Sequence, residues 1–252
     1  MKVVFKHAAR SRDGQAKPPH VRYFLLLAKV VFIGALLITS VLYGNGRNRE
    51  AHAEQNAPLP KAWIKIDLQQ PAKSFGIVRR EGRKPLRFRV GFGRRGVQCE
   101  GARFKDGYSL LGTFEVNALL SSDTFKMSEE LRKFSPRGER YLREHLFANM
   151  NSIDFDNDGR SGEYGGGFIS LKPLSPTPQP FNFGEFKGRY RWYSYAIHGT
   201  NTPERLGSAS TGGCINVGAA ALRALFEQLA VGDQVQVFAN GSFTPTGCYD
   251  AR

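Results

Sequence analysis

The alternation of apolar and polar residues along the chain predicts a domain built mainly from β-strands. From Trp63 to Leu68 the sequence WIKIDL places large apolar residues at every second position, which is the spacing of a half-buried strand. Comparable segments predict about seven strands, two of which form a hairpin around a turn at 81–83. The expected strands are 63–68, 74–79, 86–90, 112–117, 167–171, 189–197 and 234–238.

Two segments have the longer period of an amphipathic helix. Gly218–Ala230 carries apolar residues at i, i+3, i+4 and i+7, which predicts a helix whose stripe packs in the core. Ser128–Met150 also has a helical pattern, although Ser135 and Pro136 interrupt it. Residues 172–184 contain four prolines and predict an irregular surface loop. The residues of the stripe are Leu222, Leu225, Phe226 and Leu229.

The amino-terminal segment predicts export from the cytoplasm. Residues 1–22 are basic, and the apolar segment 23–43 that follows is interrupted only by Lys29. This segment is either the apolar region of a signal peptide or an uncleaved membrane anchor, because its length suits both. Ala51-His52-Ala53 has the form of a cleavage site but lies some distance beyond the apolar residues. We expect the chain beyond residue 54 in the periplasm or at the outer face of the cytoplasmic membrane.

Composition supports a folded, basic domain. The 252 residues carry a formal charge of +14, and 41% of them are hydrophobic, which excludes a disordered or collagen-like chain. Eight basic residues between Arg79 and Arg95 accompany the predicted hairpin. They are either solvated strand and turn positions or a contact surface for an anionic envelope polymer. Nucleic acid is not an expected partner, since the domain is exported.

Candidate chemistry is concentrated between His198 and Asn216. Cys214 precedes the predicted helix, whose amino terminus would favour the thiolate, and it follows glycines whose amides can approach a substrate carbonyl. His198, at the end of a predicted strand, is the natural base, because His145 lies in a charged helical segment. The residues alone also allow a buried, inert cysteine beside a glycine turn. One histidine and one cysteine are too few for a zinc site.

The segment HGTNTPERLGSASTGGCIN, residues 198–216, closely resembles the signature of the L,D-transpeptidase (YkuD-like) catalytic domain family. Weaker similarity is found in Leu110–Val116, where Leu111 replaces a proline of the family pattern. The resemblance spans roughly 63–240 and implies a mainly β (α+β) fold, a sandwich or barrel-like sheet with an inserted helical segment at 118–166 and one helix after the cysteine. The remaining segments are a linker at 44–62 and a tail at 241–252.

The resemblance also implies roles for individual residues. Cys214 is the expected nucleophile and His198 its base, with the Gly199 carbonyl orienting the imidazole and the Gly213 and Cys214 amides forming the oxyanion hole. The expected substrate-binding residues are Thr211, Gly212 and Asn216. Many family members have histidine at the position of Gly212, so substrate positioning is where this chain departs from the pattern.

The family reaction acts on peptide stems of peptidoglycan and requires no cofactor. The cysteine attacks the bond between diaminopimelate and D-alanine, releases D-alanine and passes the acyl group to an acceptor amine. Water as acceptor would give an L,D-carboxypeptidase. A degraded domain that only binds the cell wall is the alternative from another class, suggested by Gly212 and the basic hairpin. The family further implies that carbapenems acylate the cysteine. A papain-like peptidase fits poorly, because its nucleophile precedes its histidine in the chain.

Two features stand apart from this chemistry. Cys99 and Cys248 remain once Cys214 is assigned, and an oxidising compartment favours a disulfide between them. Asp154, Asp156 and Asp158 match the first half of a calcium loop, although the twelfth position, where such a loop has glutamate, is Gly165. The expectation is therefore either a structural calcium site or an ordinary acidic turn.

Overall fold

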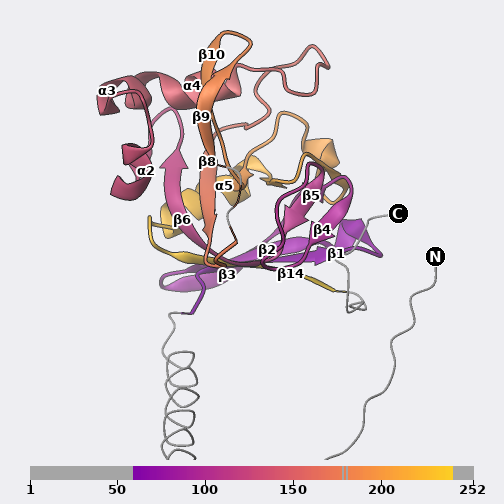
Figure 1. Cartoon of the computed structure of the whole chain (residues 1–252). Helices are drawn as coiled ribbons and strands as arrows, with labels where there is room; N and C mark the ends of the chain where they lie inside the picture. Colours follow the sequence, from indigo (N-terminus) through magenta and orange to yellow (C-terminus); the bar gives the residue numbers. More distant parts are fainter. Residues whose placement is uncertain (1–58, 178, 180, 241–252) are drawn as a thin grey trace, which may run out of the picture. The chain divides into compact units, whose positions relative to one another are not determined.

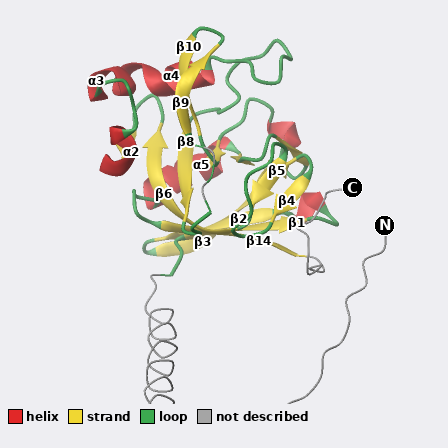
Figure 2. Ribbon diagram, in the orientation of Figure 1, coloured by secondary structure: helices red, strands yellow, loops and turns green. Residues whose placement is uncertain are grey.

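Strands dominate the molecule, as the alternation of the sequence predicted (Figures 1 and 2). The computed structural model describes residues 59–177, 179 and 181–240. The longer strands are β1 (Ala62–Asp67), β2 (Phe75–Arg80), β3 (Arg83–Gly93), β6 (Gly112–Leu120), β8 (Phe168–Pro173), β9 (Asn182–Phe186), β10 (Arg189–Tyr193) and β14 (Gln234–Asn240). The short strands are β4 (Gly96–Gln98), β5 (Tyr108–Leu110), β7 (Phe125–Met127), β11 (Ala196–His198), β12 (Ala209–Thr211) and β13 (Ile215–Val217).

Helices are few and short. The helices are α2 (Glu129–Lys133), α3 (Glu139–Tyr141), α4 (Phe147–Asn151) and α5 (Ala219–Gln228), with a π-helical turn η2 (Leu142–Leu146) and 3-10 turns η1 (Pro71–Lys73) and η3 (Pro203–Arg205). The predicted interruption of the first helical segment is confirmed, because α2 ends at Lys133 and α3 begins at Glu139. Ser128 caps α2 by accepting a hydrogen bond from the Leu131 amide at 3.2 Å.

The main sheet closes on itself. Its order is β12-β3-β13-β11-β8-β6-β14-β1-β2, and β2 pairs back onto β3. The closure depends on the length of β3, whose first part pairs with β2 while Val90 and Gly91 pair with β13. The mainly β, barrel-like architecture is therefore confirmed. The hairpin predicted around residues 81–83 is also confirmed, because β2 and β3 are antiparallel neighbours there.

Two hydrophobic clusters fill the molecule. The larger one lies inside the closed sheet and includes the helix stripe, of which Leu222, Leu225 and Leu229 are buried and Phe226 is partly buried. The smaller one lies between the outer side of the sheet and α2–α4, and its largest member is Trp192 of β10. Figure 1 shows α2, α3 and α4 beside the β9–β10 hairpin at one end of the view, away from β1, β2 and β14. The segment 118–166 thus packs on a second core that it shares with β8, β10 and β11.

The structure corrects two predicted segments. The strand expected at 189–197 is two strands, since β10 pairs only with β9 whereas β11 belongs to the main sheet. The break falls at Ser194 and Tyr195, where the chain passes from one sheet to the other. The loop expected at 172–184 is also shorter than predicted, because β8 extends to Pro173 and β9 begins at Asn182.

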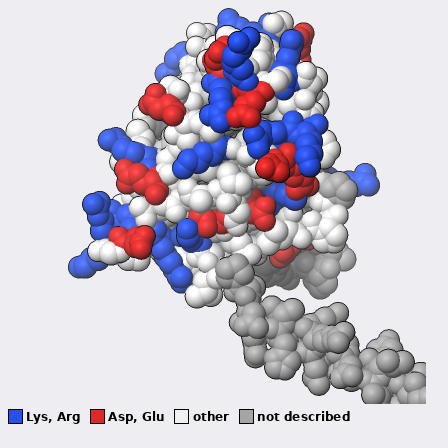
Figure 3. Space-filling view, turned by 90° about the vertical axis from the view of Figure 1, so that its left-hand side faces the viewer, with Lys and Arg blue, Asp and Glu red and all other residues white. Residues whose placement is uncertain are grey.

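Several predictions lie outside the described residues. These are the basic segment 1–22, the apolar segment 23–43, most of the linker 44–62, the tail 241–252 and Cys248. In the part that the structure describes, no helix is long and apolar enough to cross a membrane. Figure 3 looks onto one side of the molecule and shows basic and acidic groups interspersed there. Exposed ion pairs of the domain include Arg143 with Glu139 and Lys172 with Glu130.

Candidate active site

Parallel pairing of two short strands brings the predicted nucleophile and base into one pocket. Ile197 of β11 pairs with Ile215 of β13, and His198 pairs with Asn216. By the same register Cys214, the residue before β13, lies opposite Ala196 at the start of β11, two residues from His198 and on the same face of the sheet. Cys214 and His198 both line a pocket of about 520 Å³. The two residues are 16 positions apart in the sequence. They share the pocket because the segment between them leads from β11 back to the neighbouring strand β13.

His198 is buried and fixed in orientation. Its side chain is 6% exposed, and its Nδ1 atom lies 2.7 Å from the carbonyl oxygen of Gly199. Rings of Tyr164 and Phe168 flank the imidazole, with centroids 4.7 Å and 6.2 Å away. Burial lowers the pKa of His198 to about 4, although hydrogen bonding to the Gly199 and Glu163 backbone carbonyls partly opposes this. At neutral pH the ring is uncharged, and with Nδ1–H donating to Gly199 the lone pair of the ring is on Nε2.

Cys214 is a protonated thiol in this structure. Burial raises its pKa to about 11, and only a hydrogen bond from the Ala196 amide acts in the opposite direction. The sulfur lies 3.8 Å from the carbonyl oxygen of Ser194, to which the thiol donates. Among the described residues no hydrogen bond joins the Cys214 sulfur to His198, so the thiol must turn from Ser194 before the imidazole can take its proton.

The expected helix contribution to the thiolate is wrong. Cys214 was placed just before the helix, but β13 separates it from α5, which begins at Ala219. The partial charge of a helix terminus acts over about one turn, whereas three extended residues span roughly 10 Å. The sulfur therefore gains no stabilisation of its charged form from α5, which agrees with its raised pKa.

Hydrogen bonds fix the turn that carries the cysteine. The Thr211 hydroxyl donates to the Cys214 carbonyl at 2.7 Å and accepts from the Gly213 amide at 3.0 Å. The buried Ser109 hydroxyl donates to the Gly213 carbonyl at 2.7 Å. The Gly213 amide, expected in the oxyanion hole, thus faces Thr211 here. Ser109 was missed by sequence reasoning, and its only signal was its place beside the weakly similar segment 110–116.

The two glycines before Cys214 differ in how much room they have. Gly213 has φ of 135°, and a Cβ atom there would lie 2.7 Å from the Tyr108 carbonyl oxygen. A Cβ atom on Gly212 would lie 3.5 Å from Asp106 Oδ1, which is ordinary contact. We therefore expect Gly213→Ala to reduce turnover about tenfold or more, because the turn must shift the sulfur. Gly212→Ala is the matched comparison and should lose less turnover than Gly213→Ala, because its Cβ atom makes only ordinary contacts; equal losses in both variants would contradict this assignment.

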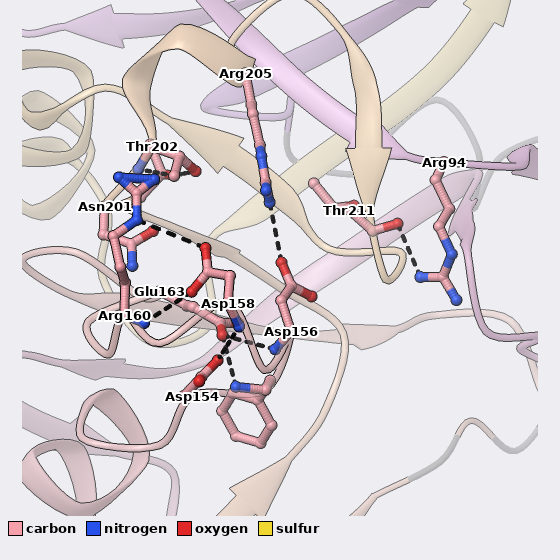
Figure 4. A network of polar contacts seen from close by, with 12 residues as sticks. Arg94, Asp154, Asp156, Asp158, Arg160, Glu163, Asn201, Thr202, Arg205 and Thr211 are labelled. Atoms are coloured by element: carbon pink, nitrogen blue, oxygen red, sulfur yellow. Dashed lines mark hydrogen bonds and ion pairs between the residues drawn. The ribbon is translucent and has the colours of Figure 1, made fainter.

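Charged side chains form the walls of the pocket (Figure 4). Arg94 pairs with Asp106, and both groups lie within 4 Å of the position that a Cβ atom on Gly212 would take. On the other wall Arg205 pairs with Asp156 at 3.0 Å. Sequence reasoning did not assign these arginines, because they come from elements far apart in the chain. The wall residues from the predicted insertion are Phe155, Asp156, Glu163 and Tyr164.

The acidic loop does not gather its carboxylates around one point. The Asp154 carboxylate accepts the Asp158 amide at 3.1 Å, and the Asp156 carboxylate pairs with Arg205. The Glu163 carboxylate accepts the Asp156 amide at 3.0 Å, and its burial together with the nearby negative charges raises its pKa. Throughout 59–177, 179 and 181–240, no group of three possible metal ligands occurs. Calcium binding stays a prediction that requires the Asp156–Arg205 pair to open.

Other expected site residues also find a place in the structure. Asn216 lines the pocket, and its side-chain carbonyl oxygen is buried without a hydrogen-bond partner among the described residues. His145 is exposed on η2, next to Glu144, and does not line the pocket. Cys99 is disulfide-bonded. Its expected partner Cys248 lies outside the described residues, so the pairing itself stays a prediction.

Comparisons with known proteins give one family match. The family model of the YkuD L,D-transpeptidase catalytic domain matches residues 61–237. No curated protein matches the chain. Solved structures similar to it include an L,D-transpeptidase from Mycobacterium smegmatis, at 13% identity, a TM-score of 0.33 and coverage of 71% of this chain and 59% of that one.

Two further solved structures have comparable similarity. An L,D-transpeptidase from Xylanimonas cellulosilytica is 14% identical with a TM-score of 0.32, covering 73% of this chain and 63% of that one. L,D-transpeptidase 3 from Mycobacterium tuberculosis, in complex with a faropenem-derived adduct, is 11% identical with a TM-score of 0.35, covering 71% and 60%. The chain thus spans about three fifths of the length of the solved structures that it matches.

Proposed function

Because the chain belongs to the family of L,D-transpeptidase catalytic domains, we propose that it cross-links peptidoglycan through an acyl group carried on Cys214. The observation that supports this most directly is the shared pocket in which Cys214 lies beside a buried, neutral His198. A neutral imidazole with its lone pair on Nε2 is a competent base for a thiol. A buried inert cysteine would not require such a partner.

The proposed reaction has two acyl transfers. His198 Nε2 takes the thiol proton as the Cys214 sulfur attacks the carbonyl between diaminopimelate and D-alanine. The carbon–nitrogen bond then breaks, D-alanine leaves as its amine with that proton, and a thioester remains. An acceptor amine attacks the thioester, loses its proton to His198, and the thiol forms again. The Gly199 carbonyl holds the Nδ1–H throughout, so that Nε2 faces the reacting atoms.

Three residues near the sulfur are proposed to bind substrate. Asn216 lines the pocket, and its side-chain amide is proposed to bind a peptide group of the substrate. Gly212 leaves the approach to the sulfur open, and Thr211 fixes the turn. The Cys214 amide is the proposed main oxyanion donor, with Gly213 contributing if its amide turns away from Thr211.

The resting thiol predicts a distinct pH dependence. Since the pKa of Cys214 is about 11 and that of His198 about 4, thiol and neutral imidazole coexist between these values. Alkylation of Cys214 by iodoacetamide should rise about tenfold per pH unit from pH 7 to 10, because the thiolate reacts. Peptide mapping by mass spectrometry measures the rate at this cysteine. A rate that is constant from pH 5 to 8 would instead indicate a preformed thiolate–imidazolium pair.

Product analysis separates the proposed reaction from its alternatives. The full-length chain is incubated with muropeptides that carry tetrapeptide stems, and the products are identified by mass. Cross-linked dimers are the expected product. Tripeptide stems without dimers would indicate an L,D-carboxypeptidase, and unchanged muropeptides would favour a domain that only binds the cell wall. The same incubation with a carbapenem should raise the mass of the protein by one drug unit.

Location and a second partner are also proposed. The amino-terminal sequence supports export, with 23–43 serving as a signal peptide or an anchor. The β2–β3 hairpin supports contact with an anionic envelope polymer, because its basic side chains are exposed. The exposed basic residues are Arg79, Arg83, Lys84, Arg87 and Arg89. If this contact exists, purified envelope polymer should retain the full-length chain at low salt and retain it less at high salt, because salt screens charge contacts.

A further inference from the structure

Three guanidinium groups line the pocket, and their partners differ. Arg94 and Arg205 are paired with carboxylates of the pocket itself, Asp106 and Asp156. Arg191 of β10 is the third. Within residues 59–177, 179 and 181–240, no hydrogen bond or ion pair to Arg191 is found, and its contacts are with aromatic faces. Among the described residues, Arg191 is therefore the pocket arginine that has no carboxylate partner.

Alternation along β10 directs Arg191 to the pocket. Tyr190 and Trp192 are 5% and 1% exposed and belong to the smaller hydrophobic cluster. Arg191 and Tyr193 are half-buried, point to the opposite side of the strand, and both line the pocket. The position is therefore set by the strand and its core, which is a more rigid support than a loop.

Aromatic rings hold the guanidinium group while leaving its donors available. The Arg191 guanidinium carbon lies 4.9 Å from the Phe186 ring centroid and 5.9 Å from that of Tyr193. A guanidinium group over a ring face keeps its N–H groups at its edge, where they can bind a carboxylate in a bidentate manner. Its charge also reaches the rings beside the nucleophile, since it opposes the rise in pKa of Tyr164 and Tyr193 that burial causes.

We propose that Arg191 is the residue that binds a free carboxylate of the substrate and so selects peptide stems that carry one near the reacting bond. This assignment rests on the proposed function, because it identifies the ligand as the donor stem. A tetrapeptide stem offers two such groups, the carboxylate of its terminal D-alanine and that of its diaminopimelate side chain. Both present the same chemistry to a guanidinium group, and the experiment distinguishes them.

Binding is measured calorimetrically with the full-length chain carrying Cys214→Ala, so that no turnover occurs. Three ligands are compared: the tetrapeptide stem, the stem amidated at D-alanine and the stem amidated at the diaminopimelate carboxylate. Arg191→Gln should weaken binding of the unmodified stem about tenfold or more, which corresponds to about 1.4 kcal/mol. The loss should disappear for the one analogue whose amide replaces the carboxylate that Arg191 binds. Arg191→Lys should show an intermediate loss, because it keeps the charge without the bidentate geometry.

Arg189→Gln is the matched control. Arg189 lies on the same side of β10, is exposed, bonds to Ser152 and does not line the pocket. The Arg189→Gln substitution should leave the affinity for all three ligands unchanged. In the chain that retains Cys214, Arg191→Gln should raise KM about tenfold or more and leave kcat within about twofold.

The outcomes separate this assignment from the proposed function. Equal affinity of Arg191→Gln and its parent for the unmodified stem would overturn the role of Arg191, even if the wild-type chain is active. Binding that depends on Arg191 in a chain that does not release D-alanine would support the role and overturn the proposed reaction. Failure of the parent to bind any stem would overturn both.

Discussion

A Cys214→Ala variant is expected to lose acyl-enzyme formation completely while it keeps its fold. Among the described residues Cys214 is the only thiol that lines the pocket, and removal of a nucleophile typically costs several orders of magnitude in rate. The fold should persist because the sulfur makes one long hydrogen bond, 3.8 Å to the Ser194 carbonyl. Intact mass after incubation with the stem substrate or a carbapenem reports the acyl group, and a thermal melt reports the fold.

His198→Ala should reduce acylation about a hundredfold or more, since the thiol with its raised pKa then lacks a base. His145→Ala is the control, because that histidine is exposed and outside the pocket. Its turnover should equal that of the wild type. A Cys214→Ala chain that still gains mass, or a His198→Ala chain as fast as His145→Ala, would remove the proposed mechanism.

Trp192→Ala is expected to have the largest effect on stability. The ring is 1% exposed and contacts Phe168, Phe181 and Phe183 at centroid distances of 5.5, 5.7 and 5.6 Å. Truncation of a buried aromatic residue to alanine lowers the free energy of unfolding by about 3–5 kcal/mol. In a domain of this size the Tm should fall by roughly 6 °C or more.

Trp192→Ala should also lower turnover, because the same strand carries Arg191 and Tyr193, which line the pocket. Phe134→Ala provides the comparison, since Phe134 is 62% exposed and its ring contacts only the edge of this cluster at Phe181, 5.8 Å away. Its Tm should change by about 2 °C or less. Similar melting temperatures for Trp192→Ala and Phe134→Ala would show that the cluster contributes little to the fold.

Period-two patterns predicted the strands that are buried on one side, such as β1, β2 and β14, but not β9. β1, β2 and β14 lie close to their expected bounds, as does α5 with its apolar stripe, whereas β3 has 11 residues and extends beyond the expected 86–90 at both ends. β4, β5, β7, β12 and β13 have only three residues each, which is too short for a period to be recognised. The split at Ser194 was also missed, since tertiary contacts and not local residues decide which sheet a strand joins.

Some residues of the site were predicted from the sequence and others were not, for a similar reason. His198 and Cys214 stand in one segment whose residue types and spacing indicate nucleophile and base, and the pocket contains both. Arg94, Arg191 and Tyr164 also line it but come from β3's end, β10 and the loop after α4. Only the closed sheet and the smaller cluster bring them together. The prediction that the helix favours the thiolate of Cys214 was wrong, because the pKa of this thiol depends on burial, which the sequence does not reveal.

The two faces of β10 restrict how the proposed substrate preference of this chain can change over evolution or in the laboratory. Point substitutions at 191 and 193 alter groups that face the pocket and leave Tyr190 and Trp192 in their core. Insertion or deletion of a single residue within β10 would do the opposite, because it exchanges the two sides of the strand beyond that point. Trp192 would then face the ligand and a charged residue would enter the apolar cluster. New specificities are accessible here through exchange of side chains, while changes in strand length are excluded.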